Sequence, residues 1–212
     1  MTRPESPPDS LSAGPQVAVL MYPGVSELEV GLLLGLLLHL NQEGSPASSD
    51  AAALTVARTR GSLVCAGGLV STPHLNYAAT PPLAGLLIPS GLGAQRAGRD
   101  AATRAFVRAQ AARGVPVGAC GSGVLLAGEA GLLAGRVIGV APELVETAWG
   151  YLPADVQGGQ VVGDEPGATA FRLFSGPGQL AALRVALKLA ACVWPSERVA
   201  AAAGRIGAEG SE

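Results

Sequence analysis

The chain has 212 residues, of which 49% are hydrophobic and 14% are charged, so it is long enough and apolar enough to bury a substantial core. A net charge of −2 excludes the basic surface that is typical of a nucleic-acid-binding domain. The three cysteines lie far apart and form no CxxC pair, which excludes a disulfide framework and a cysteine-based zinc site.

The two ends of the chain are predicted to be flexible tails, over residues 1–15 and 201–212, on either side of a single domain over residues 16–200. The first tail is rich in proline, serine and acidic residues and has no apolar stretch of the kind that a signal peptide needs. The longest apolar run, Val30 to Leu38, is nine residues long, whereas about 20 are needed to cross a bilayer. We therefore expect a cytoplasmic protein without a membrane-spanning segment.

In the first half of the chain, short apolar runs without alternation predict buried strands over residues 17–22, 54–57 and 83–88. A glycine-centred stretch predicts a hairpin over residues 63–71. Ser26-Glu27-Leu28-Glu29 matches the Ser-x-x-Glu capping box, which predicts a helix from Glu27 to about Asn41. That helix is apolar almost all round, so it is either deeply buried or part of a subunit interface.

The second half of the chain continues the alternation. Helices are expected over residues 100–113, 122–129, 142–149 and 179–194, and strands over residues 115–119, 137–140 and 171–174. Strands that alternate with helices predict an α/β fold with a mostly parallel sheet and helices on both faces. In such sheets, ligands bind at the carboxyl ends of the strands, which directs attention to the loops at 23–26, 89–93 and 120–123.

The last of these loops holds a cysteine between a predicted strand and a predicted helix, in the run Gly118-Ala119-Cys120-Gly121-Ser122-Gly123. A nucleophile on a strained turn needs small residues two positions before and after it, and Gly118 and Ser122 meet that need. A helix N-terminus would favour the thiolate, the reactive species. We therefore expect Cys120 to be an exposed thiol. Spacing alone leaves an alternative open, in which Cys120 is a small buried hydrophobe in a glycine-rich contact.

Three stretches of the sequence resemble the ThiJ/PfpI family, within the class I glutamine-amidotransferase-like fold. They are VAVLMYPGVSEL from Val17 to Leu28, LLIPSG from Leu86 to Gly91, and CGSGVLLAGEAGLLAGR from Cys120 to Arg136. The resemblance covers about residues 16–195 and is closest to the isocyanide-hydratase-like and regulator-like branch. It implies a flavodoxin-like three-layer sandwich with a mostly parallel central sheet and a nucleophile elbow.

The resemblance also implies a role for five residues. Cys120 matches the elbow nucleophile, and Glu29 matches the acidic residue that contacts the cysteine from the first helix. Ser90 and Gly91 match a Gly-Gly loop whose backbone N–H groups form the oxyanion pocket, to which Gly121 would add another backbone N–H. Glu29 has a second interpretation, because it is also the third helical residue of the predicted capping box.

The sequence departs from the family pattern near the cysteine. Many relatives have a histidine directly after it, but Gly121 stands here, and a Thr-Thr-His-Trp stretch is replaced over residues 138–141. Neither His39 nor His74 is expected to reach Cys120, so a Cys-His dyad is not predicted.

Two hypotheses for function stay open. The first is a cysteine-dependent enzyme of hydratase, glyoxalase or amidase type that acts on a small electrophilic molecule, with no cofactor and no metal. The second is a non-catalytic redox-sensing or ligand-sensing protein with a role in stress response or regulation. In both cases we expect a small-molecule partner and a homodimer, the latter from the resemblance and the apolar first helix, and neither nucleic acid nor a membrane as partner.

Overall fold

The computed structural model of the chain describes residues 15–42, 53–167 and 169–207. The expected N-terminal tail lies outside these ranges except for residue 15, and residues 208–212 of the expected C-terminal tail lie outside them too. The prediction of a flexible tail is wrong for residues 201–205, because they belong to helix α7, Ser196–Arg205. This helix buries Ala202 and packs against the first helix, so its run of alanines is a contact surface and not a frayed end.

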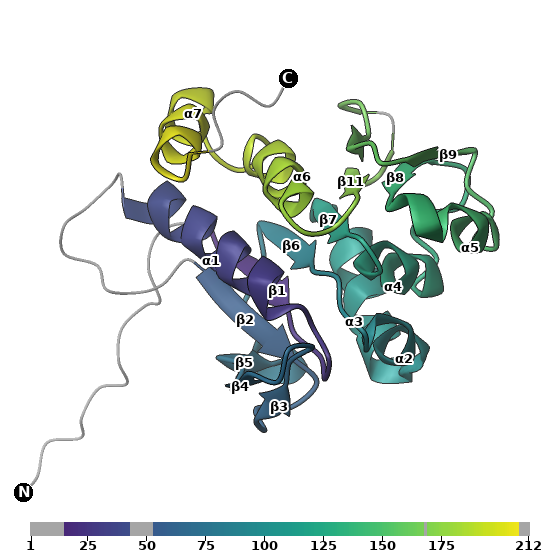
Figure 1. The fold of residues 1–212 in the computed structure, drawn as a ribbon. Coiled ribbons are helices and arrows are strands. Elements are labelled where there is room, and N and C mark those ends of the chain that lie inside the picture. The colour runs from purple at the N-terminus through teal and green to yellow at the C-terminus, as the bar shows by residue number, and fades with distance from the viewer. Residues whose placement is uncertain (1–14, 43–52, 168, 208–212) are drawn as a thin grey trace, which may run out of the picture.

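The core of the described structure is a seven-stranded sheet in the order β10-β11-β7-β6-β1-β2-β5 (Figure 1). All neighbouring pairs are parallel except β10 and β11. The strands are β1 Val17–Leu20, β2 Ala53–Ala57, β5 Leu75–Asn76, β6 Gly85–Ile88, β7 Val117–Cys120, β10 Val162–Gly163 and β11 Leu173–Gly176. The predicted α/β fold with a mostly parallel central sheet is confirmed.

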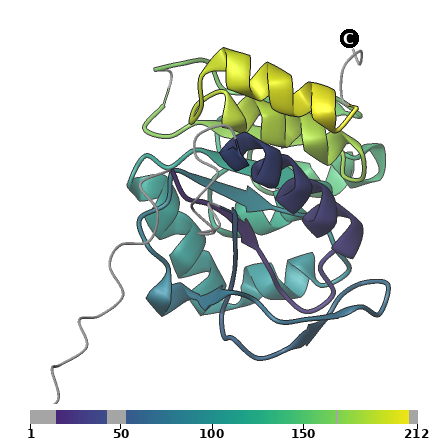
Figure 2. The ribbon, with the colours of Figure 1, turned by 90° about the vertical axis from the view of Figure 1, so that its left-hand side faces the viewer.

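Helices cover both faces of the sheet and complete a three-layer sandwich. One layer contains α1 Glu27–Gln42, α6 Ala181–Ala190 and α7, which Figure 2 shows lying together as the purple and yellow helices. The other layer contains α2 Ala94–Arg99, α3 Ala101–Ala112 and α4 Gly123–Glu129. The helix expected over 179–194 is shorter than predicted, and α2 was not predicted at all. None of the helices in the described ranges combines the length and the apolar character needed to cross a membrane.

Smaller elements surround this sandwich. The predicted hairpin is present as the antiparallel strands β3 Leu63–Val64 and β4 Val70–Ser71. The strand predicted over 137–140 is β8 Val137–Val140, but it lies outside the central sheet and pairs in parallel with β9 Asp155–Gly158. The 3-10 turn Pro142–Leu144 and helix α5 Val145–Trp149 connect these two strands, and a second 3-10 turn, Tyr77–Ala79, follows β5.

The order of the strands changes direction between β1 and β6, because β2 follows β1 on one side whereas β7 and β11 follow β6 on the other. The loops after β1 and β6 are joined there by a bridge between Val25 and Gly91 and by a 2.8 Å hydrogen bond from Ser26 N to the Ser90 carbonyl. In an open α/β sheet, the crevice beside such a switch point is the usual place for a ligand.

Candidate functional site

The turn after β7 is where the prediction and the structure differ most. Cys120 is the last residue of β7, pairs with Gly176 of β11 and is 0% exposed. The tight turn comes one residue later, at Gly121, whose φ of +49° lies in the left-handed region that favours glycine. The expectation of an exposed Cys120 on the turn is therefore wrong. The reason is that the β ladder extends through Cys120 and fixes its side chain on a face of the sheet.

The side of the sheet on which Cys120 lies follows from the alternation of side chains along β7. A Cβ atom added to Gly118 would lie 3.1 Å from a methyl group of Val185 and 3.5 Å from one of Leu189, both on α6. Cys120 is two residues further along and shares this face, which is covered by α1 and α6.

The same burial reverses the expected charge state of the thiol. Removal from water raises the pKa of Cys120 well above its usual value, and the negative charge of Glu29 on α1 raises it further. The raised pKa favours the neutral thiol, whereas the predicted helix N-terminus was expected to favour the thiolate.

Glu29 is fully buried and its carboxylate is occupied by three donors. The backbone N–H groups of Ser90 and Gln179 each donate to it at 2.7 Å, and the Ser90 hydroxyl makes a close hydrogen bond to Oε1. The Ser26 hydroxyl accepts the Glu29 N–H at 3.3 Å, so only half of the capping box forms. Within the described residues, Glu29 has no hydrogen bond to Cys120. The carboxylate therefore joins two loops and does not assist the thiol.

The three backbone donors predicted to form an oxyanion pocket are all engaged inside the protein. Ser90 N donates to Glu29, Gly91 N donates to the Ser122 hydroxyl at 2.9 Å, and Gly121 N donates to the Gly176 carbonyl at 2.9 Å. Stabilisation of an oxyanion requires N–H groups that point at the substrate. The described geometry provides none from these three residues.

The space beside Gly121 is also filled. A Cβ atom at position 121 would lie 2.8 Å from the Ser90 Cβ and 3.3 Å from the Gly178 Cα. Ser90 stands where the family pattern has a glycine, and its side chain occupies the space next to the turn. Serine at position 90 and glycine at position 121 are therefore sterically compatible, because a side chain at position 121 would clash with that of Ser90.

A cavity of about 630 Å³ opens on the outer side of this turn, and we call it the elbow cavity. Three of the five predicted site residues line it (Ser90, Gly91 and Gly121), whereas Cys120 and Glu29 do not. Sequence reasoning missed several other lining residues, which come from α2, from the 3-10 turn after β8 and from the loop before α6. The polar ones among these are Gln95, Glu143 and Gln179.

Comparisons with known proteins identify the architecture. No protein-family model matches the sequence, and no curated protein matches it significantly. A ThiJ/PfpI family protein from Pseudomonas syringae superposes with a TM-score of 0.77 at 22% identity, over 99% of this chain and 84% of that one. DJ-1beta of Drosophila melanogaster gives a TM-score of 0.76 at 18% identity, over 91% and 97% of the two chains. This chain has the ThiJ/PfpI and DJ-1 fold.

A third similar structure is a mutant of a DJ-1 superfamily protein from Salmonella typhimurium, with a TM-score of 0.72 and 24% identity over 91% of this chain and 98% of that one. The predicted resemblance is therefore confirmed at the level of the ThiJ/PfpI and DJ-1 fold. At the turn after β7, where the resemblance predicts the nucleophile elbow, the residue with the left-handed φ is Gly121.

Proposed function

We propose that this protein is a non-catalytic member of its fold that binds a small molecule reversibly in the elbow cavity. The observation that carries the proposal is the turn after β7, where Gly121 offers no side chain and the Cys120 thiol is sealed behind it. Covalent catalysis needs a nucleophile that reaches the substrate. Ser122 does not replace it, because its hydroxyl donates to the Gly91 carbonyl at 2.8 Å and accepts the Gly91 N–H.

The lining of the elbow cavity favours a neutral or cationic ligand. Glu143 is the charged residue of the described lining, and it is accompanied by the amides of Gln95 and Gln179 and by apolar side chains such as Leu92 and Leu144. An anion would meet the Glu143 carboxylate without a lysine or arginine to balance it. A volume near 630 Å³ lies within the usual range for small-molecule sites.

The enzyme hypothesis has one observation in its favour, namely that Glu29 lies close enough to Cys120 to raise the pKa of its thiol. To react, however, Cys120 would have to leave the ladder with β11 and lose a proton in a buried site. Reversible oxidation of Cys120 meets the same obstacle, because oxidation follows thiolate character and exposure. Ligand sensing is therefore the hypothesis that the geometry supports best.

Turnover assays with cyclohexyl isocyanide and methylglyoxal test the absence of catalysis. We expect rates equal to the buffer background for the wild type, for Cys120→Ala and for Glu29→Gln. Turnover that disappears in Cys120→Ala would contradict the proposal and restore the enzyme hypothesis.

Binding is tested with N-cyclohexylformamide, a neutral probe with one hydrogen-bonding group. Titration should shift the backbone amide resonances of Gly91 and Gly121, and Leu144→Trp, which fills part of the elbow cavity, should abolish the shifts. Leu38→Trp places the same side chain on the exposed part of α1 and is the matched control. Shifts that persist unchanged in Leu144→Trp would count against this site.

We also propose a homodimer formed through α1 and a cytoplasmic location. A groove of about 390 Å³ runs between α1, α6 and the end of α7, and it is lined by Leu28, Leu32, Leu183 and Ile206. Leu28 is 49% exposed, and an open apolar helix face is typical of a subunit interface. Sedimentation should give a dimer for the wild type and a monomer for Leu28→Lys, whereas a wild-type monomer would contradict the proposal.

A further inference from the structure

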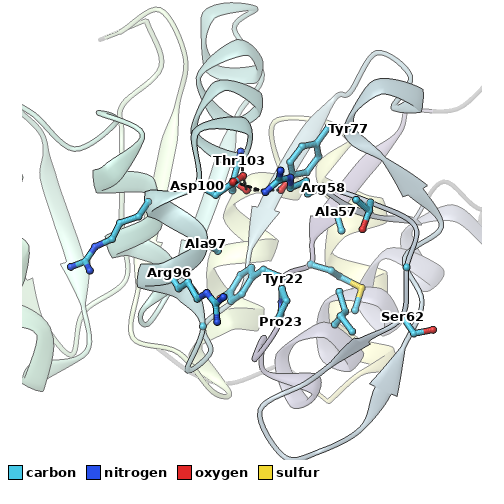
Figure 3. Close-up of a pocket in the computed structure, with 16 residues that line it drawn as sticks. Tyr22, Pro23, Ala57, Arg58, Ser62, Tyr77, Arg96, Ala97, Asp100 and Thr103 are labelled. Carbon is cyan, nitrogen blue, oxygen red and sulfur yellow. Dashed lines mark hydrogen bonds and ion pairs between the residues drawn. The ribbon is translucent and has the colours of Figure 1, made fainter.

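A second cavity of about 620 Å³ lies at the carboxyl ends of β1 and β2 (Figure 3). Its walls come from the loop after β1, from the chain between the end of β2 and the start of β3, from the 3-10 turn after β5, and from α2 and the start of α3. It shares no lining residue with the elbow cavity. We call it the arginine cavity, because Arg58, Arg96 and Arg99 line it.

The floor of the arginine cavity is apolar and held in place by defined contacts. The Tyr22 ring is 3% exposed and its hydroxyl donates to the Pro89 carbonyl at 2.6 Å. Tyr77 stacks on Phe106 with ring centroids 4.3 Å apart, and its hydroxyl lies 3.1 Å from that of Thr103. Figure 3 shows the Tyr22 and Tyr77 rings on two sides of the hollow. Tyr22 is buried, so it supports the floor, whereas the half-buried Tyr77 ring is the aromatic surface that a flat apolar group can reach.

The charges around this floor are unbalanced. Asp100 is the single acidic residue of the described lining, and it is largely satisfied by α3, since it accepts the Thr103 N–H at 2.9 Å and the Thr103 hydroxyl at 3.0 Å. These hydrogen bonds lower the pKa of Asp100 and keep it ionised. Asp100 also forms an ion pair with Arg58, 2.8 Å from Nη1 to Oδ1.

The arginines keep donors available for a ligand. Within the described ranges, Arg58 uses only Nη1, and Arg96 has no hydrogen bond or ion pair. Figure 3 shows the two guanidinium groups on different sides of the hollow, so an anion placed between them is attracted by both. A guanidinium also offers paired N–H groups that match a carboxylate or a phosphate.

We propose that the arginine cavity binds a small organic anion, with its carboxylate or phosphate between Arg58 and Arg96 and its flat apolar body against Tyr77. The site is independent of the proposed function of the elbow cavity, which lacks a basic side chain. Its volume lies within the range of known small-molecule sites. The ligand differs from that of the elbow cavity in the sign of its charge.

The test compares benzoate, phenyl phosphate and benzamide in titrations of the full chain followed by backbone amide resonances. Benzamide has the shape of benzoate without its charge, so we expect benzoate to bind about tenfold more tightly. The shifts should fall at residues 57–63 and 96–103. The ratio of phenyl phosphate to benzoate affinity tells whether the site prefers a phosphate or a carboxylate.

Arg96→Gln should weaken benzoate binding about tenfold, and Arg104→Gln, on α3 but outside the lining of the cavity, is the matched control with no expected change. Arg96 is exposed, so its loss should leave folding intact. Equal affinities for benzoate and benzamide, wild-type affinity in Arg96→Gln, or no binding of any probe at millimolar concentration would overturn the proposal. Shifts centred on Gly91 and Gly121 would overturn it as well, because they belong to the elbow cavity.

Discussion

The elbow cavity and the arginine cavity lie at the same edge of one sheet, yet they treat their polar groups in opposite ways. Beside the elbow cavity, the N–H groups of Ser90, Gly91 and Gly121 and the carboxylate of Glu29 are all paired within the protein. In the arginine cavity, Arg58 and Arg96 keep unused donors. The residue types of an active site are therefore not sufficient to make a catalytic site. The polar groups that stay unpaired within the protein decide what a site can bind.

The largest expected effect concerns the reactivity of the cysteines. Cys120 should react with iodoacetamide at least about a thousandfold more slowly than Cys192, because Cys192 is exposed whereas Cys120 must wait for the structure to open. Mass spectrometry after timed labelling, with Cys192→Ser to isolate the slow site, measures both rates. Similar rates in the native protein would break the comparison, since the elbow region would then hold an available nucleophile.

Next comes the buried carboxylate that joins the loops of the elbow region. Glu29→Ala leaves the N–H groups of Ser90 and Gln179 without an acceptor, so it should lower the free energy of unfolding by about 3 kcal/mol. Glu197→Ala removes an exposed acid from the first turn of α7 and should cost about 0.5 kcal/mol. Urea denaturation compares the two, and an equal small loss in both would mean that Glu29 is not a structural link.

A smaller effect is expected at the turn itself. Gly121→Ala should cost about 2 kcal/mol, from the left-handed φ and from the contact with the Ser90 Cβ. Gly135→Ala separates these causes, because Gly135 has a φ of +71° but no atom within 4 Å of an added Cβ, so strain alone should cost about 1 kcal/mol. The cost of Gly121→Ala should fall in a Ser90→Gly background. Additive effects would show that positions 90 and 121 are independent.

The smallest expected effect is on the free energy of unfolding, and it concerns the arginine cavity. Arg58 is 67% exposed in its side chain, so Arg58→Gln should change the free energy of unfolding by less than about 0.5 kcal/mol despite the ion pair with Asp100. Asp100→Ala should cost about 1 kcal/mol, because Asp100 also caps α3. Thermal unfolding measures both, and a large loss in Arg58→Gln would assign the arginine to stability instead of ligand binding.

Much of the fold could be predicted from the sequence, because short apolar runs without alternation, such as residues 17–22, suit strands that are covered on both faces, and β1 lies within that run. The position of the turn could not, since a pattern of residues does not say where a β ladder ends. Only the pairing of Cys120 with Gly176 decides that the strand includes the cysteine. The two interpretations of Glu29 were likewise separable only by the direction of its side chain, which points to Ser90 and Gln179.

The arginine cavity gave no signal in the sequence. Its main residues, Arg58 and Arg96, are far apart in the chain, and α2, which carries Arg96, has only six residues. A helix so short and so rich in alanine, glycine and arginine lacks the apolar period by which helices are predicted. Its packing against α4 is what places Arg96 beside the end of β1.

The loop after β6 separates the two cavities at three consecutive residues, 91–93. Gly91 and Leu92 line the elbow cavity, and Gly93 lines the arginine cavity. A hydrogen bond from Gly93 N to the Gly24 carbonyl holds this loop against the loop after β1. A ligand that displaces this loop from either side would narrow the other cavity. Binding of a ligand in one cavity would then change the affinity of the other cavity for its own ligand, although the two ligands make no contact.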